Sequence, residues 1–343
     1  MLDSVRLKTI VMKRLLAFVM LFMIVVPMMA HSVIVEDDCY KIKHNWTYNE
    51  VEWSCRLSIP VELYEYYQER THVGDDFSHY VLSEFDRDCI RDLVQSFRTG
   101  GEKLGLSETD NVYNVISFVQ SLQYMYDIKS KREDDYVRYP VETLVDGVGD
   151  CEDMVILAAS ILYEMGYKVL LVSLPDHLAL AVECRESFPG TYYEYDDERY
   201  YYLEMTNIGW DLGQIPAQFK NTKAQLIPIV NKPVIFPNSC SYQYDSYWST
   251  DATVDIKMRC SISNWGPGKT DGMTLHVLFK PYSTSTHVYK EQQFRLVELP
   301  EGGSAEFEVV MPLPRPFMGV IEFRVEGLNF DTKSIFVEGV HLE

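Results

Sequence analysis

The sequence YPVETLVDGVGDCEDM, which spans Tyr139–Met154, decides the expected fold of the first part of the chain. Two glycines make a turn, and Asp150 is a favourable N-cap residue for the segment that follows. Apolar residues recur in that segment at helical spacing, which predicts a central helix over 151–165 that a glycine ends. Cys151 is then the first residue of this helix. Because the N–H groups and partial positive charge of a helix N-terminus favour thiolate over thiol, this position is typical of a reactive cysteine.

Helical patterns precede the central helix, and strand patterns follow it. The expected elements are extended segments over 33–60, helices over 84–97 and 109–124, a short helix over 140–144, and strands over 169–174, 177–184 and 200–204. Helices that are followed by antiparallel-type strands favour an α+β fold.

The chain changes character at the proline-punctuated stretch 227–237. Beyond it, alternating runs separated by turn sequences predict strands over 253–262, 273–279, 305–311 and 320–325. Strands at this spacing favour an all-β sandwich. We therefore divide the 343 residues into a targeting segment (1–30), an α+β domain with an N-terminal extension (31–230) and a β-sandwich domain (231–343).

The first 30 residues match a targeting segment. Two basic residues precede the apolar run LLAFVMLFMIVV (Leu15–Val26), and a small residue, Ala30, follows it. The run is shorter than the roughly 20 apolar residues of a membrane span, which favours a secretory signal peptide. Met28 stands where cleavage prefers a small residue, so an uncleaved membrane anchor remains an alternative. Either way we expect an extracytoplasmic protein, secreted or anchored at the cell surface, in which disulfides are permitted.

The chain is strongly acidic. It contains 51 Asp and Glu residues against 31 Lys and Arg, which gives a formal net charge of −20. A polyanion of this size repels phosphate backbones, so nucleic acid is excluded as an expected partner. An acidic surface suits solubility and divalent cations, and a solvated surface without a specific partner is the simpler interpretation.

The seven cysteines are an odd number, which predicts one unpaired thiol. Two pairs are close enough in sequence to close short loops, two further cysteines are a third pair or two buried free thiols, and one is left over. The two close pairs are Cys39 with Cys55 and Cys240 with Cys260. Cys89 and Cys184 are the third pair or the two free thiols, and Cys151 is the cysteine left over.

A cysteine nucleophile needs a general base and a group that orients the base. His177 begins the strand-like run HLALAVE and shares one face of it with two alanines, which leave room around an imidazole. Glu204 ends the run YYYLE on the same face as Tyr202. A thiol on a helix, opposite two strands that carry a histidine and a carboxylate, is the arrangement that cysteine triads use. We predict that Cys151, His177 and Glu204 are the catalytic residues.

Four separated motifs in the first domain carry a resemblance to a known family. They are SFVQSLQY (Ser117–Tyr124), RYPVETLVDGVGDCED (Arg138–Asp153), LPDHLALAV (Leu174–Val182) and YYYLEMTNIGWDLGQIP (Tyr200–Pro216). Together they resemble the transglutaminase-like superfamily, and within it a group of archaeal and bacterial exported proteins. The resemblance spans roughly 57–216 and implies a papain-related fold with a Cys–His–Asp triad, in which the cysteine opens the central helix.

The resemblance also implies roles for individual residues. Cys151 would be the nucleophile and His177 the general base. Glu204 takes the position usually held by aspartate and reaches one methylene further. Gln120 or Tyr139 would add a donor to an oxyanion hole formed with the backbone N–H of Cys151.

Known members of the superfamily hydrolyse or transfer acyl groups of amides. We therefore expect an exported cysteine-dependent acyl hydrolase, similar to a protease or amidase, which acts on a protein or peptide through a thioester. One alternative is a protein-crosslinking transglutaminase, in which an amine takes the same intermediate. Another is a non-catalytic module for surface binding or assembly. The turn sequences NWGPGKTDG (264–272) and PEGGS (300–304) resemble immunoglobulin-like adhesion modules, which implies that the C-terminal domain positions the catalytic domain or binds a cell-surface partner.

Acidic residues crowd the cysteine. Carboxylates are ordinary in the first turn of a helix, but Asp150, Glu152 and Asp153 also raise the pKa of a neighbouring thiol. The segment resembles bacterial transglutaminase-like periplasmic proteases, in which acidic residues beside the cysteine bind calcium. The resemblance implies Ca²⁺ at Asp150 and Glu152, where it would neutralise the cluster. No other cofactor is expected.

Overall fold

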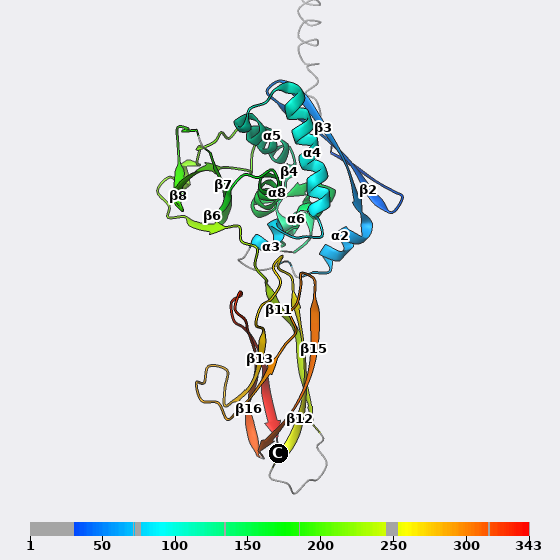
Figure 1. Cartoon of the computed structure of the whole chain (residues 1–343), viewed down its shortest axis with the longest axis vertical. Coiled ribbons are helices and arrows are strands. Elements are labelled where there is room, and N and C mark those ends of the chain that lie inside the picture. Colours follow the sequence, from blue (N-terminus) through cyan, green and yellow to red (C-terminus); the bar gives the residue numbers. More distant parts are fainter. Residues whose placement is uncertain are drawn as a thin grey trace, which may run out of the picture.

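We describe the fold from a computed structural model of the chain (Figure 1). The structure describes residues 31–70, 72, 77–133, 135–184, 186–244, 253–314 and 316–342, so the expected targeting segment (1–30) lies outside the described residues. The fold mixes helices and strands in several sheets, and strands predominate. A compact region that contains the helices adjoins an elongated region made of strands. No described helix is long and apolar enough to span a membrane.

The chain begins with a three-stranded antiparallel sheet. Its strands are β1 (Ser32–Glu36), β2 (Cys39–Tyr48) and β3 (Val51–Pro60), which confirms the predicted extended segments. Every second residue of β3 is buried, as expected for a strand with one face on the core. That buried face packs against the helix α4 (Arg87–Leu104).

Seven helices are described in this region. They are α2 (Val61–Gln68), α3 (Ser78–Val81), α4, α5 (Glu108–Gln120), α6 (Asp127–Ser130), α7 (Pro140–Asp146) and α8 (Cys151–Glu164). Helix α8 is the predicted central helix, and α3, α4, α5 and α7 pack around it. The predicted helix over 84–97 runs on to Leu104 despite two glycines. A Cβ atom at Gly100 would lie 2.2 Å from the ring of Trp53, so the glycine is required for close packing against β3.

A five-stranded antiparallel sheet lies against α8 in the order β10-β6-β7-β9-β8. Its strands are β6 (Val169–Leu174), β7 (His177–Glu183), β8 (Tyr192–Tyr195), β9 (Glu198–Leu203) and β10 (Gln225–Pro228). The strands β6, β7 and β9 match the prediction closely. β8 and the edge strand β10 were not predicted. A two-stranded parallel sheet, β4 (Gln123–Tyr124) with β5 (Val148–Gly149), joins the end of α5 to the turn before α8.

The elongated region consists of two antiparallel sheets that share one apolar core. The first contains β11 (Ile235–Tyr244), β12 (Thr253–Asn264) and β15 (Ser304–Pro314). The second contains β13 (Thr274–Lys280), β14 (Lys290–Arg295), β16 (Phe317–Glu326) and β17 (Lys333–Leu342). The four strands predicted from alternation correspond to β12, β13, β15 and β16, whereas β11, β14 and β17 were not predicted.

The cysteines correct one predicted pairing and confirm another. Cys240 and Cys260 lie directly opposite each other on β11 and β12 and form a disulfide. Cys39 and Cys55 are both free, because Cys39 faces Pro60 in the β2–β3 ladder while Cys55 faces His44. The remaining three cysteines, Cys89, Cys151 and Cys184, are also free thiols.

A buried arginine joins the two regions. Arg70 donates from Nη2 to the carbonyl of Trp265 at 2.7 Å, and its Nη1 lies 4.0 Å from Oε1 of Glu301. Four aromatic rings surround the guanidinium at 5.1–5.8 Å, and they belong to Tyr66, Tyr67, Tyr139 and Trp265. Glu301 also accepts hydrogen bonds from the Ser83 hydroxyl and the Glu84 N–H. The junction is therefore a buried, charged contact.

Candidate active site

A tight turn places the cysteine at the start of α8. The Asp153 side chain accepts a hydrogen bond from the backbone N–H of the N-cap residue Asp150 at 3.2 Å. A Cβ atom at Gly149 would lie 2.6 Å from the Asp153 side chain, so only glycine fits there. Cys151 follows as the first residue of the helix. The turn sequence therefore determines where the thiol lies.

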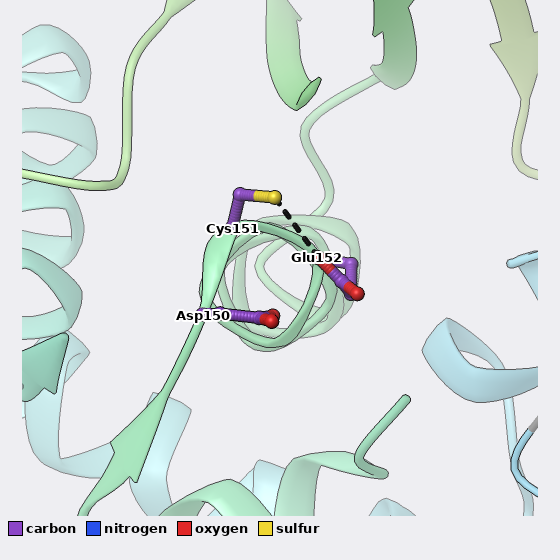
Figure 2. Close-up of side chains that lie close together, drawn as sticks. All are labelled: Asp150, Cys151 and Glu152. Carbon is purple, nitrogen blue, oxygen red and sulfur yellow. Dashed lines mark hydrogen bonds between the residues drawn. The ribbon is translucent and has the colours of Figure 1, made fainter. Parts of the chain in front are cut away.

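The Cys151 thiol donates a hydrogen bond to Glu152 Oε2 at 2.9 Å (Figure 2). Burial and the charge of Glu152 raise the pKa of the thiol well above its usual range, and the hydrogen bond to Glu152 acts in the same direction. The backbone N–H of Leu178 lowers the pKa, but by less. The helix N-terminus was expected to favour thiolate. In this arrangement the acidic neighbours and burial outweigh it, and the thiol is protonated.

His177 and Glu204 form a hydrogen-bonded pair. His177 is the first residue of β7, and its Nε2 lies 2.9 Å from Oε2 of Glu204, which directly follows β9. Glu204 also accepts from the Tyr202 hydroxyl at 2.9 Å and from the Thr206 hydroxyl and N–H at 2.8 and 3.1 Å. Burial raises the pKa of Glu204, but the bonds from His177 and its neighbours outweigh burial, so the net pKa is lowered. Glu204 is therefore an ionised carboxylate with an oriented imidazole.

Two of the predicted catalytic residues lie in one cleft of about 890 Å³ between α8 and the five-stranded sheet. Cys151 and His177 both line it, and the ring of Phe219 stacks on the imidazole with centroids 5.1 Å apart and planes 5° apart. Since Nε2 bonds to Glu204, the imidazole has Nδ1 left for a reacting group. In this arrangement the thiol bonds to Glu152 and not to His177. The structure therefore places Cys151 and His177 in one cleft and bonds His177 to Glu204, without a formed thiol–imidazole bond.

The two residues suggested for an oxyanion hole lie elsewhere. Gln120 donates from Nε2 to the Glu204 carbonyl at 2.8 Å and accepts from the Gly209 N–H at 3.2 Å. Its amide thus braces the segment that carries Glu204. Tyr139 belongs to the aromatic group around Arg70 at the junction of the two regions. Neither side chain lines the cleft, so the suggestion was wrong for both.

Sequence reasoning missed two aromatic residues of the cleft. Tyr124 is placed beside the turn by the pairing of β4 with β5, in which it faces Gly149. Burial raises the pKa of Tyr124, and the charge of Cys151 adds to the effect, so the two groups are close in space. Phe219 comes from a short 3₁₀ segment, Ala217–Phe219, between β9 and β10. The sequence could have pointed to Tyr124, because it ends the first of the four motifs, but it contained nothing that pointed to Phe219.

The acidic residues at the cysteine form two groups. In each group, every residue has one possible metal-ligand atom within 4.8 Å of those of the other two. The first group is Asp150, Cys151 and Glu152, and the second is Asp127, Asp150 and Asp153. The second group is already neutralised in part, because Arg138 Nη1 lies 2.6 Å from Asp127 and 2.5 Å from Asp153.

Asp150 differs from the other members of these groups. It is only 8% exposed, and no described residue bonds to its Oδ1. Burial raises its pKa to about 10, with the charges of Asp153 and Glu152 as further causes. An orphaned carboxylate oxygen beside a second carboxylate fits the oxygen ligands that Ca²⁺ takes.

Comparisons with known proteins give distant likenesses only. No family model matches the chain, and no curated protein matches it. Among solved structures, the ApaA protein from Bordetella pertussis is 18% identical over 32% of this chain and 94% of its own, with a TM-score of 0.24. A red sea bream transglutaminase is 8% identical over 91% of this chain and 74% of its own, with a TM-score of 0.29. These TM-scores are too low to support an argument, so the proposals below rest on the geometry of the site.

Proposed function

We propose that this protein is an exported cysteine-dependent acyl hydrolase, which cleaves an amide bond of a protein or peptide through a thioester on Cys151. One observation supports the proposal above all. His177 is hydrogen-bonded through Nε2 to buried, ionised Glu204, and it lines the same cleft as a thiol at a helix N-terminus. A base, a group that orients it and a nucleophile in one cleft are the parts that a cysteine triad needs.

The proposed reaction has two halves. His177 Nδ1 accepts the thiol proton, and the sulfur of Cys151 forms a bond to the substrate carbonyl carbon. The backbone N–H of Cys151 stabilises the oxyanion. The imidazolium then gives its proton to the leaving amine as the C–N bond breaks, which leaves a thioester. In the second half the imidazole takes a proton from water, and the water oxygen displaces the sulfur to release the acid. Glu204 holds the imidazole in place and stabilises its charged form throughout.

The hydrogen bond from Cys151 to Glu152 must break before the thiol can react. We propose that Asp150 and Glu152 hold Ca²⁺, which would supply positive charge at the acidic end of α8. The two carboxylates then lose their unfavourable effect on the thiolate. Addition of CaCl₂ should raise the melting temperature of the protein, and EGTA should reverse the change. An unchanged melting temperature would remove calcium from the proposal and leave the triad standing.

We further propose a transglutaminase-like, papain-related domain over 31–230, followed by an immunoglobulin-like domain over 231–343. The helix that begins with Cys151 and packs on β7, the strand that begins with His177, supports the first assignment. The two antiparallel sheets with a shared core support the second. The Cys240–Cys260 disulfide fits export through the leader expected at residues 1–30. The C-terminal domain would hold the catalytic domain at a surface or contact a partner there.

The first test is alkylation of Cys151 by iodoacetamide at pH 7.5, followed by peptide mass spectrometry so that other thiols do not interfere. We expect His177→Ala to slow alkylation of Cys151 about tenfold or more, because the thiol loses the base that accepts its proton. Alkylation of Cys89, a free thiol in α4, is the internal reference. Equal rates in wild type and His177→Ala would contradict the proposal.

A non-catalytic binding module is the second candidate. The observation that favours it is the thiol itself, which is protonated and bonded to Glu152 instead of His177. Equal alkylation rates in the test above would support this candidate.

A further inference from the structure

The cleft around Cys151 has an unusual lining. Five carboxylates line it, and no Lys or Arg among the described residues does. The five are Asp127, Asp135, Asp150, Glu152 and Asp176. Apart from His177, the ionisable side chains with a basic or carboxyl group that line the cleft are thus acidic, and the net charge of the whole chain, −20, is negative too. A cleft lined by one sign of charge concentrates ligands of the opposite sign.

Two of these carboxylates are available to a ligand. Asp176 is exposed in the two-residue turn between β6 and β7, directly before His177. Asp135 is exposed in the loop before α7. Asp127 differs from both, because it is buried and bound to Arg138 at 2.6 Å.

A third carboxylate lacks a partner. Asp150 is only 8% exposed, and no described residue bonds to its Oδ1, although the residue lines the cleft. A buried carboxylate oxygen without a partner is costly, and a bound donor or cation removes that cost. This observation indicates a ligand independently of the number of acidic residues.

Exposed apolar side chains lie among the carboxylates. Tyr126 and Ile128 line the cleft and are 59% and 58% exposed. The rings of Tyr124 and Tyr126 meet edge to face with centroids 5.4 Å apart. Long basic side chains place their methylene stems on apolar surface and their charges beside carboxylates or over aromatic rings. The mixture of rings and carboxylates therefore matches Lys and Arg better than it matches a small cation alone.

We propose that the substrate is a polypeptide with Lys or Arg residues next to the amide that Cys151 attacks. The inference rests on the proposed function, because it names the substrate class of the same site. Asp176 and Asp135 bind the flanking basic side chains, and Tyr126 with Ile128 receives their methylene stems. A segment rich in Asp or Glu is repelled from the cleft.

The first experiment measures the charge preference of the cleft without catalysis. Three methanethiosulfonates are compared, one with a trimethylammonium group, one with a sulfonate and one that is neutral, and modification of Cys151 is followed by peptide mass spectrometry in EGTA. For Cys151, the rate constant with the cationic reagent is divided by the rate constant with the anionic reagent. This ratio is then divided by the same ratio for the free thiol 2-mercaptoethanol, which removes the intrinsic difference between the reagents. We expect this normalised ratio to be about tenfold or more above one and to fall toward one in 0.5 M NaCl.

Charge variants connect the preference to named residues. The pair Asp135→Asn with Asp176→Asn should reduce the normalised ratio at least threefold. The matched control is Asp196→Asn with Asp197→Asn, which changes two exposed aspartates in the β8–β9 turn, outside the cleft. This control should keep the wild-type ratio. A ratio near one in the wild type, or an equal loss in both pairs, would overturn the inference.

The second experiment tests the polypeptide. Peptides with one central amide site and either Lys or Glu on both sides are compared by kcat/KM, which should favour Lys about tenfold or more. Equal or reversed values would overturn the inference even if the reagents showed a preference. Failure of the proposed function is a separate result, because the neutral reagent reports the reactivity of Cys151 and its dependence on His177. A reactive thiol without a charge preference removes only the substrate class.

Discussion

The thiol of Cys151 donates its hydrogen bond to Glu152 across 2.9 Å, although the imidazole of His177 lines the same cleft. A nucleophilic cysteine has to transfer its proton to the base, and a bond to a carboxylate holds the proton on sulfur. Burial and Glu152 together therefore keep the proton on the sulfur in this arrangement. Any step that neutralises or displaces Glu152 should increase the reactivity of Cys151.

Glu152→Gln tests this relationship. The change removes a negative charge that raises the thiol pKa, so the rate of Cys151 alkylation by iodoacetamide at pH 7 should rise about tenfold. Glu164→Gln, at the other end of α8, is the control and should leave the rate unchanged. If calcium acts through the same carboxylate, it should accelerate alkylation in wild type but not in Glu152→Gln. A rate in Glu152→Gln at or below the wild-type rate would show that this carboxylate does not hold the proton on sulfur.

Glu204→Gln tests the orienting carboxylate. An amide cannot stabilise an imidazolium as a carboxylate does, so the burst of p-nitrophenol that p-nitrophenyl acetate gives on acylating Cys151 should slow about 100-fold or more. Glu198→Gln changes a half-buried carboxylate at the start of the same strand, β9, which pairs with Lys168, and should keep the wild-type burst. Both variants are checked for folding by their melting temperatures. A wild-type burst in Glu204→Gln would leave the residue with a structural role only.

Arg138→Met tests the ionic group around Arg138 at the start of α8. Arg138 is fully buried and bonds to Asp127, Asp146 and Asp153, so its removal leaves buried carboxylates without a counter-charge. We expect a loss of about 3–5 kcal/mol in the free energy of unfolding, measured by urea denaturation. Arg91→Met, which breaks an exposed pair with Glu164, should cost about 0.5 kcal/mol or less. Equal stability of the two variants would contradict this account.

The surroundings of Glu322 predict that the stability of the strand-rich region depends on pH. Burial raises its pKa, but hydrogen bonds from Arg324, Lys280 and Ser334 outweigh burial and lower it. A carboxyl whose folded pKa is lowered stabilises the fold above its unfolded pKa of about 4.3, and the contribution is lost as the pH falls through the folded pKa. We expect the free energy of unfolding to fall by about 1–2 kcal/mol on acidification through this window.

Glu322→Gln should remove this dependence, because the substituted side chain does not titrate. Glu338→Gln, an exposed position on β17, should retain the wild-type pH profile. Unfolding is followed by Trp265, which lies in the same region. Identical profiles for wild type and Glu322→Gln would show that the Glu322 cluster does not contribute to acid sensitivity.

Most of the fold near the site could be predicted from local signals. Asp150 as a cap, an apolar segment and a glycine determine α8, and continuous apolar runs determine β6 and β7. The elements that were not predicted depend on tertiary contacts. β10 (Gln225–Pro228) is short and contains proline, and it becomes a strand because it pairs with the edge of β6. Helix α4 continues through Gly100 because the glycine fits against Trp53, which is distant in sequence.

In the candidate site, too, local sequence signals predicted some features, and others depend on tertiary contacts. The alternation of YYYLE places Tyr202 and Glu204 on one face, and the hydrogen bond between them agrees with that prediction. The bond between His177 and Glu204 required two strands to be neighbours, which the motif order indicated. The partner of the thiol could not be predicted, because the rotamers of Cys151 and Glu152 depend on packing in the cleft.

The strand β10 has a mechanical consequence. Its residues Gln225 and Ile227 form part of the cleft wall, and only residues 229–234 separate it from β11 of the elongated region. β10 lies at the edge of its sheet, where β6 is the strand that it pairs with. Tension between the two regions would therefore pass along the backbone into the wall beside His177. An attachment that pulls on the C-terminal region would thus act directly on the width of the cleft.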